Sequence, residues 1–544
     1  MPSKLPELLA PVKDFSCLKV AILSGADAVY FGGKRFSARA RATNFSDDEL
    51  LRAIDYCQSN GVKPYIAMNT LMTDRELTDF FTQVQNVHNA AAAAIIVQDI
   101  GAMQFLHKYA PQVVVHASTQ AGAKTIDDIK TLHALGCKRI VLARELSAKS
   151  IAEITNFAHG LGVEIEIFIH GAMCASVSGE CLMSSFIGDR SANRGMCAQP
   201  CRMLYKCRDD AVEQDKASCL LNMKDLSLID YIPQLINMGV DSLKIEGRMK
   251  GEHYIHTVVS QYRAALDGKI YDKHKLYSAF DRGGYSADYF LDSIKNDKHN
   301  RFATSKPKNQ FANQGNFELD NNDRLIENAG NKQKNDEVKI EYYPPKKRKA
   351  KSNNPQLIVQ AVTKEQAKIA SKYGLQVVTP PKTLNIFNTQ WLMAQKYLQQ
   401  SGLAKTGDEG ESRVDINTIT LSPELNSSQM ADIIKVVPVD CIVYGRLPLM
   451  HLVDNPYQNS LIDRTGAEFP IIGDFLYNSV PIYMADKWRD ICTIGLTAAR
   501  LVFTTENADE AERVIKLYMA AQNGAPPDDV SVKVFGKKFS RGKF

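Results

Sequence analysis

The first half of the chain alternates between two spacings of hydrophobic residues. Short apolar or β-branched runs, which predict buried strands, are each followed by a stretch whose apolar residues recur at helical spacing. Two of these helical stretches, SDDELLRAIDYCQSNG and SAKSIAEITNFAHGLG, begin at a serine and end at a glycine, as capped helices do. The predicted strands are Glu7–Ala10, Ala28–Phe31, Lys63–Met68, Ala94–Gln98, Val113–His116, Arg139–Ala143, Glu164–His170 and Ser242–Glu246.

Eight strand–helix repeats of this length predict a (β/α)8, or TIM-like, barrel at residues 1–275, so the expected fold class is α/β. An open doubly wound sheet is the alternative, because spacing alone does not prove that a sheet closes. No Gly-x-Gly-x-x-Gly motif follows the first strand, which disfavours a dinucleotide-binding fold. The longest gap between strands separates the seventh from the eighth, and it holds a cysteine-rich insertion at residues 171–240.

The second half of the chain is expected to contain a linker, a smaller domain and a tail. Residues 276–354 are polar and basic and predict a linker with little core of its own. Strand–helix alternation returns over residues 355–522 and predicts a second α/β domain, which a basic tail follows at residues 523–544. The most basic segments, expected to be exposed, hold Lys346, Lys347, Arg348, Lys349 and Lys351, and Lys537, Lys538, Arg541 and Lys543.

Composition and charge indicate the compartment and the kinds of partner to expect. Hydrophobic residues make up 44% of the 544 residues, which is enough for two cores, but no apolar run approaches the roughly 20 residues of a membrane helix. The first residues lack the pattern of a signal peptide, so we expect a soluble, cytoplasmic protein with no membrane partner. A net charge of +5 permits a polyanionic partner without requiring one.

Polar residues follow nearly every predicted strand at its carboxyl end, where barrel enzymes carry their active sites. Several of them are arginines. Because a guanidinium pairs bidentately with carboxylate or phosphate, the pattern predicts a pocket for an anionic ligand. The candidate residues are Arg39, Arg41, Asn69, His116, Gln120, Arg144, His170, Lys244, Glu246 and Arg248.

The cysteines of the insertion have an uneven spacing. Cys174, Cys181, Cys197 and Cys201 form a Cys-x6-Cys-x15-Cys-x3-Cys pattern, and Cys219 follows after seventeen further residues. Zinc ribbons use two Cys-x2-Cys pairs, which this segment lacks. Long spacing favours an iron–sulfur cluster held by a folded loop, with a zinc site and buried thiols as the alternatives.

Four segments make the chain recognisable: EIFIHGAMCASVSGECLMSS, RSANRGMCAQPCR, LNMKDLSLIDYIPQLINMGVDSLKIEGRMK and HASTQ. Together they resemble the collagenase-like peptidase family U32 over residues 5 to about 290. FDRGGYSADYF, LSPEL and VYGRLPLM extend the resemblance toward its long members, which are similar to the 23S ribosomal RNA cytidine hydroxylase, more than to the short transfer RNA uridine hydroxylases. The resemblance implies oxygen-independent hydroxylation with a 4Fe-4S cluster and, in the RNA-acting members, prephenate as a co-substrate.

The resemblance also assigns roles to the cysteines. Cys174, Cys181 and Cys197 match the ligand positions of the family. Cys201 is the favoured fourth ligand and Cys219 is the alternative, because relatives differ in which of these two cysteines they keep.

The function expected from these observations is hydroxylation of a pyrimidine in ribosomal or transfer RNA, at a base that lies in a loop or is flipped out. His170, Lys244 and Glu246 are the candidates for positioning and proton transfer. Arg39, Arg41 and Arg248 would hold the carboxylates of prephenate or an RNA phosphate, and the other expected substrate-binding residues are Asn69, His116, Gln120 and Arg144. A peptidase is the alternative, although His-Glu-x-x-His and Gly-x-Ser-x-Gly are absent. A non-catalytic RNA-binding protein is the second alternative, which the polar strand ends disfavour.

Overall fold

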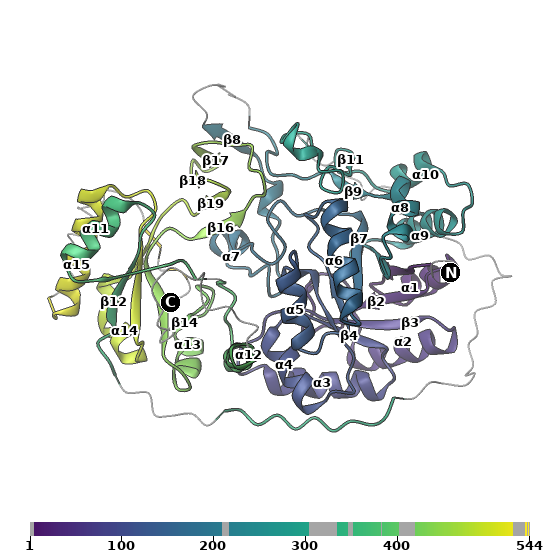
Figure 1. Cartoon of the computed structure of the whole chain (residues 1–544), viewed down its shortest axis with the longest axis horizontal. Helices are drawn as coiled ribbons and strands as arrows, with labels where there is room; N and C mark the ends of the chain where they lie inside the picture. Colours follow the sequence, from purple (N-terminus) through teal and green to yellow (C-terminus); the bar gives the residue numbers. More distant parts are fainter. Residues whose placement is uncertain are drawn as a thin grey trace. The chain divides into compact units, whose positions relative to one another are not determined.

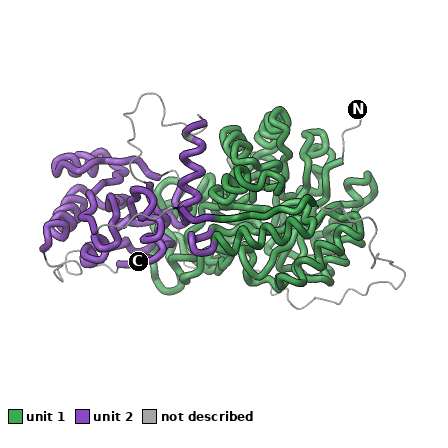
Figure 2. Tube along the Cα trace, turned by 90° about the horizontal axis from the view of Figure 1, so that it is seen from below, with its two compact units in different colours: residues 1–71, 77–342, 450–476 green, residues 72–76, 343–449, 477–544 purple. Residues whose placement is uncertain are grey.

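The computed structural model describes residues 5–208, 217–303, 335–345, 352–381, 383–401, 419–525, 539–540 and 542. The chain divides into two compact units. Residues 1–71, 77–342 and 450–476 form the first, and residues 72–76, 343–449 and 477–544 form the second (Figure 2). None of the helices in the described part of the chain is both long and apolar enough to cross a membrane.

The first unit is built on a closed barrel of eight parallel strands, which confirms the predicted fold class (Figure 1). The barrel strands β1 to β7 pair in chain order, and β7 pairs with β10, which pairs with β1, so these eight strands close on themselves. This closure excludes the open doubly wound sheet. The strands are β1 (Glu7–Pro11), β2 (Ala28–Phe31), β3 (Lys63–Met68), β4 (Ala94–Val97), β5 (Val115–Ala117), β6 (Arg139–Val141), β7 (Glu164–Gly171) and β10 (Ser242–Ile245).

Helices cover the outside of the barrel and bury one face each. In α2, Ser46 and Glu49 form a reciprocal capping box, and Leu50, Ile54 and Cys57 lie on the buried face at helical spacing. The covering helices are α1 (Phe15–Leu23), α2 (Asp47–Ser59), α3 (Leu77–Asn89), α4 (Ile100–Tyr109), α5 (Ile126–Ala134), α6 (Ala148–Gly160), α8 (Ile232–Asn237) and α9 (Glu252–Leu266).

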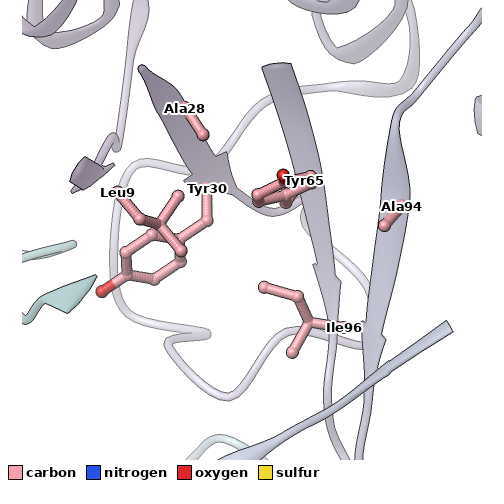
Figure 3. Packing of buried hydrophobic residues seen from close by; sticks show 6 residues of the cluster. All are labelled: Leu9, Ala28, Tyr30, Tyr65, Ala94 and Ile96. Atoms are coloured by element: carbon pink, nitrogen blue, oxygen red, sulfur yellow. The ribbon is translucent and has the colours of Figure 1, made fainter. Parts of the chain in front are cut away.

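The barrel interior is packed rather than hollow. Tyr30, Tyr65 and Ile96 are buried together with smaller neighbours from the adjoining strands (Figure 3). The hydroxyl of Tyr30 donates to the carbonyl oxygen of Ile245 at 2.9 Å. Toward the amino ends of the strands the interior is charged, because Arg139 pairs with Glu7 at 2.6 Å.

In its described residues, 171–208 and 217–240, the cysteine-rich insertion has little regular structure before α8. It contains α7 (Met183–Gly188), β8 (Tyr205–Arg208) and β9 (Asp225–Ser227), and β9 pairs with β7 and with β11 (Tyr285–Ser286). β8 belongs to a separate five-stranded sheet whose other strands come from far along the chain. These are β16 (Pro448–His451), β17 (Ser460–Asp463), β18 (Glu468–Ile472) and β19 (Phe475–Tyr477).

The second unit has a mostly parallel sheet in the order β13-β12-β21-β15-β14, with β20 antiparallel to β15. A buried ion pair between Arg500 and Asp440, 3.0 Å long, joins β21 to β15. The strands are β12 (Gln356–Gln360), β13 (Gln376–Val378), β14 (Ile419–Thr420), β15 (Val439–Gly445), β20 (Ile482–Tyr483) and β21 (Ala498–Val502). Its helices are α11 (Lys364–Lys372), α12 (Thr389–Gln400), α13 (Ser427–Ile434), α14 (Trp488–Ile494) and α15 (Ala508–Gln522).

The unit boundaries differ from the domain limits expected from the sequence. Residues 450–476 fall within the expected second domain, 355–522, but they belong to the first unit. Residues 276–303, expected to start the linker, also belong to it, because α10 (Lys273–Ser278) and the buried Tyr289, Phe290 and Phe302 pack there. The basic side chains expected to be exposed, from Lys346 to Lys351 and from Lys537 to Lys543, lie outside the described residues.

Candidate active site at the mouth of the barrel

Two adjoining cavities occupy the carboxyl end of the barrel. The outer one has a volume of about 310 Å³ and is lined largely by the insertion. The inner one has a volume of about 40 Å³ and lies between the strand ends. They share Ala38, Arg39, Thr119, Gln120, Arg144 and Glu246, so a ligand in one cavity would contact the wall of the other.

Glu246, the residue after β10, is the acidic centre of this site. Arg39 donates to its Oε1 at 3.1 Å, and Arg144 donates to its Oε2 at 3.5 Å. Burial alone would raise the pKa of Glu246, but the guanidinium groups of Arg39, Arg144 and Arg248 outweigh burial and lower it to about 2. The carboxylate is therefore ionised at neutral pH and fixes the orientation of two arginines.

Several buried polar atoms around Glu246 have no hydrogen-bond partner among the described residues. They include Arg144 Nε, Gln120 Oε1 and Arg248 Nη1. The other end of Arg248 is held, because its Nη2 donates to Ser37 Oγ at 2.6 Å. Since buried polar groups are normally satisfied, atoms of this kind at a cavity wall mark where polar atoms of a ligand would bind.

Eight of the ten polar residues singled out in the sequence line these cavities. Arg41 lines the outer cavity, and Arg39, Gln120, Arg144 and Glu246 line both. Asn69, Lys244 and Arg248 line the inner cavity. The ammonium of Lys244 pairs with buried Glu166 at 2.7 Å, so this lysine is held from the barrel interior.

The two histidines do not line either cavity. His170 is buried among tyrosines, with its Nδ1 3.3 Å from the hydroxyl of Tyr262 and its ring stacked on Tyr285. Burial, followed by the charge of Lys250, lowers the pKa of His170 to about 3. His116 is buried and meets the ring of Tyr65 edge to face, and burial lowers its pKa as well. Both imidazoles are therefore neutral at physiological pH.

The four cysteines of the spaced pattern line the outer cavity together. Cys174 accepts a hydrogen bond from Arg144 at 3.4 Å, and Cys181, Cys197 and Cys201 lie on the same wall. Cys219 does not line the cavity. Its thiol is buried and donates to the carbonyl oxygen of Arg202 at 3.7 Å.

The environment of the thiols bears on what they can hold. Burial, followed by the neighbouring cysteines, raises the pKa of Cys181, and burial raises that of Cys201 to about 12. Within the described ranges, no three His, Cys, Asp or Glu side chains converge closely enough to bind a single metal ion. A 4Fe-4S cluster takes one thiolate on each iron, so its ligands surround a volume rather than a point. Four thiols around one cavity fit that requirement.

Glycines let the insertion approach the barrel loops. Gly179, at φ +84°, lies so close that an added Cβ would overlap the carbonyl oxygen of Gln120. Gly195, at φ +81°, lies in the same way against the carbonyl oxygen of Ser37. Only glycine adopts these angles without strain, and so the sequences VSGEC and NRGMC place Cys181 and Cys197 beside the barrel mouth.

Sequence reasoning missed part of the outer wall. Arg202, Lys250 and Arg282 line the outer cavity with Asp225 and the ring of Phe280. Burial, followed by the charge of Arg282, lowers the pKa of Lys250. Lys250 follows the KIEGR segment by two residues, and Phe280 and Arg282 belong to the segment FDRGGYS. Both segments carry the resemblance to the family, but these three residues do not stand at the end of a predicted strand.

The comparison with known families decides the classification. The sequence profile described as "Peptidase family U32" matches residues 13–310, which is more than half of the chain. The chain belongs to peptidase family U32. This confirms the resemblance seen in the sequence, and the matched region holds seven of the eight barrel strands, all but β1, together with the four cysteines and the additional residues of the outer wall.

Curated U32 relatives carry names of two kinds. The chain is 38% identical over 281 residues to "tRNA hydroxylation protein P1" of Bacillus subtilis, covering 50% of this chain and 65% of that protein. It is 37% identical over 310 residues to "23S rRNA 5-hydroxycytidine C2501 synthase" of Escherichia coli, covering 54% and 46%. It is 34% identical over 305 residues to "Collagenase" of Porphyromonas gingivalis, covering 52% and 73%. The matches to the two RNA-modifying relatives thus span less than two thirds of either protein.

Proposed function

We propose that this U32 protein is an oxygen-independent hydroxylase of a pyrimidine base in ribosomal or transfer RNA. Its cofactor would be a 4Fe-4S cluster, and prephenate would be its co-substrate. The observation that carries the proposal is the joint lining of one cavity by four cysteines and by arginines fixed on Glu246. The names of the two RNA-modifying relatives support the substrate class.

Cys174, Cys181, Cys197 and Cys201 would hold the cluster. A bound cluster supplies one-electron chemistry next to the substrate pocket. Arg144 lies between this wall and the acidic centre, since it donates to both Cys174 and Glu246. The same side chain would therefore orient a substrate relative to the thiolates.

The charge of the outer cavity suits an anionic substrate. Five arginines line it, Arg39, Arg41, Arg144, Arg202 and Arg282, against the acidic pair Asp225 and Glu246. Lys250 also lines it, but burial and the charge of Arg282 lower its pKa to about 6, so it adds little charge at neutral pH. The surplus of arginines would bind an RNA phosphate or the carboxylates of prephenate. A volume of about 310 Å³ is at the small end of ligand pockets and would take one nucleobase, so the base would have to leave its stack.

The peptidase alternative rests on the name of the P. gingivalis relative. Two serines lie beside the cysteines, but the structure gives each hydroxyl another role. Ser176 Oγ accepts from the backbone N–H of His451, and Ser178 Oγ donates to Glu145 at 3.1 Å. Among the described residues, neither hydroxyl is hydrogen-bonded to a histidine ring, so an activated serine of the usual kind is not formed. A non-catalytic RNA-binding protein, the other alternative, would not need unpaired buried polar atoms beside a cysteine cluster.

Nucleoside mass spectrometry of RNA from a deletion strain tests the proposal. Loss of one hydroxylated pyrimidine is expected, and a strain unable to make prephenate should lose the same nucleoside. An unchanged nucleoside profile, together with cleavage of gelatin by the purified metal-free chain, would contradict the proposal and support the peptidase. An unchanged profile without cleavage would favour the RNA-binding protein.

A further inference from the structure

Residues 450–476 reach the cysteine-rich insertion from about 250 residues further along the chain. They lie outside the region 13–310 that the family profile matches. They nevertheless form part of the first unit. Figure 1 shows β8 beside β17, followed by β18, β19 and β16 in the same sheet. Their contacts with the insertion occur at three places.

The first contact is on the loop between Cys174 and Cys181. The N–H of Val177 donates to the carbonyl oxygen of His451 at 2.8 Å, and the N–H of His451 donates to Ser176 Oγ at 3.1 Å. The ring of His451 lies 2.7 Å from Glu180 Oε2 through its Nδ1. His451 thus binds three residues of this loop, Ser176, Val177 and Glu180.

The second contact begins just after Cys201. Tyr205 to Arg208 pair antiparallel with Asp463 to Ser460, so β8 is held in register by β17. Leu461 is buried in this ladder, and Arg208 pairs with Glu468 at 2.9 Å. The sheet therefore fixes the path of the chain as it leaves the Cys197–Cys201 pair.

The third contact joins the segment to Leu220, near the end of the insertion, and to the outer cavity. The buried hydroxyl of Tyr457 donates to the carbonyl oxygen of Leu220 at 2.5 Å. Outside the insertion, Arg301 holds the same part of the segment, because it donates to the carbonyl oxygen of Asp454 at 3.0 Å. Met450 lines the outer cavity together with the four cysteines.

We propose that residues 450–476 are a clamp that positions the cysteine-rich insertion, so that its four thiols face one cavity. An irregular loop loses much conformational freedom when it is fixed, and hydrogen bonds and strand pairing from outside must stabilise its shape. The inference rests on the proposed function only in that the clamped thiols are the ones assigned to the cluster. His451 and Leu461 are positioning residues of this clamp, and Met450 is a wall of the pocket.

Thiol protection in the full-length, metal-free chain tests the clamp. Leu461→Pro removes an N–H from β17, which pairs with β8 on one side and with β18 on the other, and this breaks the ladder. His451→Ala removes the side-chain contact with Glu180. Alkylation mapped by peptide mass spectrometry should then be faster at Cys181 and Cys201, at least tenfold in the proline variant and severalfold in the alanine variant. His451→Asn, which keeps a polar atom near the position of Nδ1, should restore much of the protection. Arg464→Ala, in the exposed turn of the same segment, is the matched control and should leave the rates unchanged.

The buried barrel thiols of Cys17, Cys57 and Cys137 report whether the rest of the chain stays folded. Wild-type protection of Cys181 and Cys201 in both disruptive variants would overturn the clamp. If the barrel thiols are also alkylated faster in Leu461→Pro, that variant is unfolded, and the comparison of His451→Ala with His451→Asn alone tests the clamp. A second readout is the rate at which a chelator removes iron from anaerobically loaded protein, which should rise in the same variants. Thiol protection does not depend on RNA hydroxylation, so a failed clamp and a failed hydroxylase give different results.

Discussion

The two ends of the barrel interior carry charge in different ways. At the amino ends of the strands lies a cavity of about 480 Å³ whose charges pair with one another. There Arg139 contacts Glu7 at 2.6 Å and Glu164 at 2.7 Å, and Arg263 contacts Asp27 at 3.1 Å. At the carboxyl ends the outer cavity is smaller, about 310 Å³, and arginines outnumber acidic side chains by five to two.

The difference lies in hydrogen-bonding capacity rather than in size. The cavity at the amino ends is larger, yet its charges already have partners in the chain. At the mouth, Arg144 Nε and Gln120 Oε1 are buried without a partner among the described residues. An unsatisfied buried polar group costs about 1–3 kcal/mol, which a ligand would recover on binding. The paired charges at the amino ends therefore contribute to stability, and the unpaired polar atoms at the mouth are free to bind a ligand.

The largest expected effect is on iron. Anaerobically purified protein should contain about four irons per chain if it holds a 4Fe-4S cluster. Replacing Cys174, Cys181, Cys197 or Cys201 by Ala should remove nearly all of it, because each would hold one iron. Cys219→Ala should retain full iron, since this thiol does not line the cavity. Iron analysis with sulfide determination checks both outcomes, and one tightly bound zinc in a colourless preparation would contradict the cluster.

The next effect tests the paired end of the barrel. Arg139→Met should lower the free energy of unfolding by about 3–5 kcal/mol, because it removes the guanidinium that pairs with both buried carboxylates, Glu7 and Glu166. Urea denaturation followed by circular dichroism measures the change. Lys149→Met, which breaks an exposed pair with Glu153, is the control and should change little. If Arg139→Met and Lys149→Met changed the free energy of unfolding equally, the buried ion pairs at the amino ends would not stabilise the barrel more than an exposed pair does.

Acid unfolding tests the charge balance at the mouth. Folding lowers the pKa of Glu246 from 4.5 to about 2, so its stabilising contribution is present above pH 4.5 and is lost as the pH falls through 2. The shift corresponds to about 3 kcal/mol at neutral pH. The stability difference between the metal-free wild-type protein and Glu246→Gln should shrink over this pH range.

Neighbouring Glu145 provides a control of opposite sign. Burial raises its pKa, so its ionised form destabilises the folded chain, and lower pH should stabilise that site. Glu145→Gln should therefore be at least as stable as the wild type at pH 7. A pH-independent difference for Glu246→Gln would mean that the arginines do not hold its carboxylate ionised.

The smallest expected effect is on RNA affinity. Arg41 is exposed at the outer cavity and has no ion pair among the described residues, so Arg41→Ala should leave thermal stability unchanged. If Arg41 contacts a phosphate, the slope of log affinity against log salt should flatten by roughly 0.7–0.9. Filter binding over a salt series measures this slope. Arg52→Ala, on the exposed face of α2, should keep the wild-type slope, and the same slope in both variants would place the RNA elsewhere.

The sequence predicted the barrel strands closely because apolar spacing and turn residues agree along the first half. β2 and β3 have the predicted bounds, and β5 begins at Val115 rather than Val113. The arginines at the mouth were predictable for the same reason, since the carboxyl ends of parallel strands meet at one end of a barrel. The clamp was not, because no local pattern indicates that Leu461 pairs with Cys207.

His170 shows why part of the site could not be predicted. Phe168 lines the inner cavity. Side chains alternate along a strand, so His170, two residues later, would be expected to point into the same cavity. The pairing of β7 with β10 shifts by one residue here, because Lys244 pairs with Phe168 and Ile245 with His170. Such an irregularity re-aims a side chain, and His170 packs against Tyr262 instead of lining the cavity. A bulge of this kind depends on the neighbouring strand, which spacing within one strand does not reveal.

The most direct test of the central claim is nucleoside analysis in a deletion strain that carries the wild-type gene, Cys201→Ala or Cys219→Ala. The claim is that the cysteine-lined mouth of the barrel is the site of RNA hydroxylation. The wild-type gene and Cys219→Ala should restore the missing hydroxylated pyrimidine, and Cys201→Ala should not, although all three proteins accumulate to the same level. Restoration by Cys201→Ala, or failure of the wild-type gene to restore any hydroxylated nucleoside, would contradict the claim.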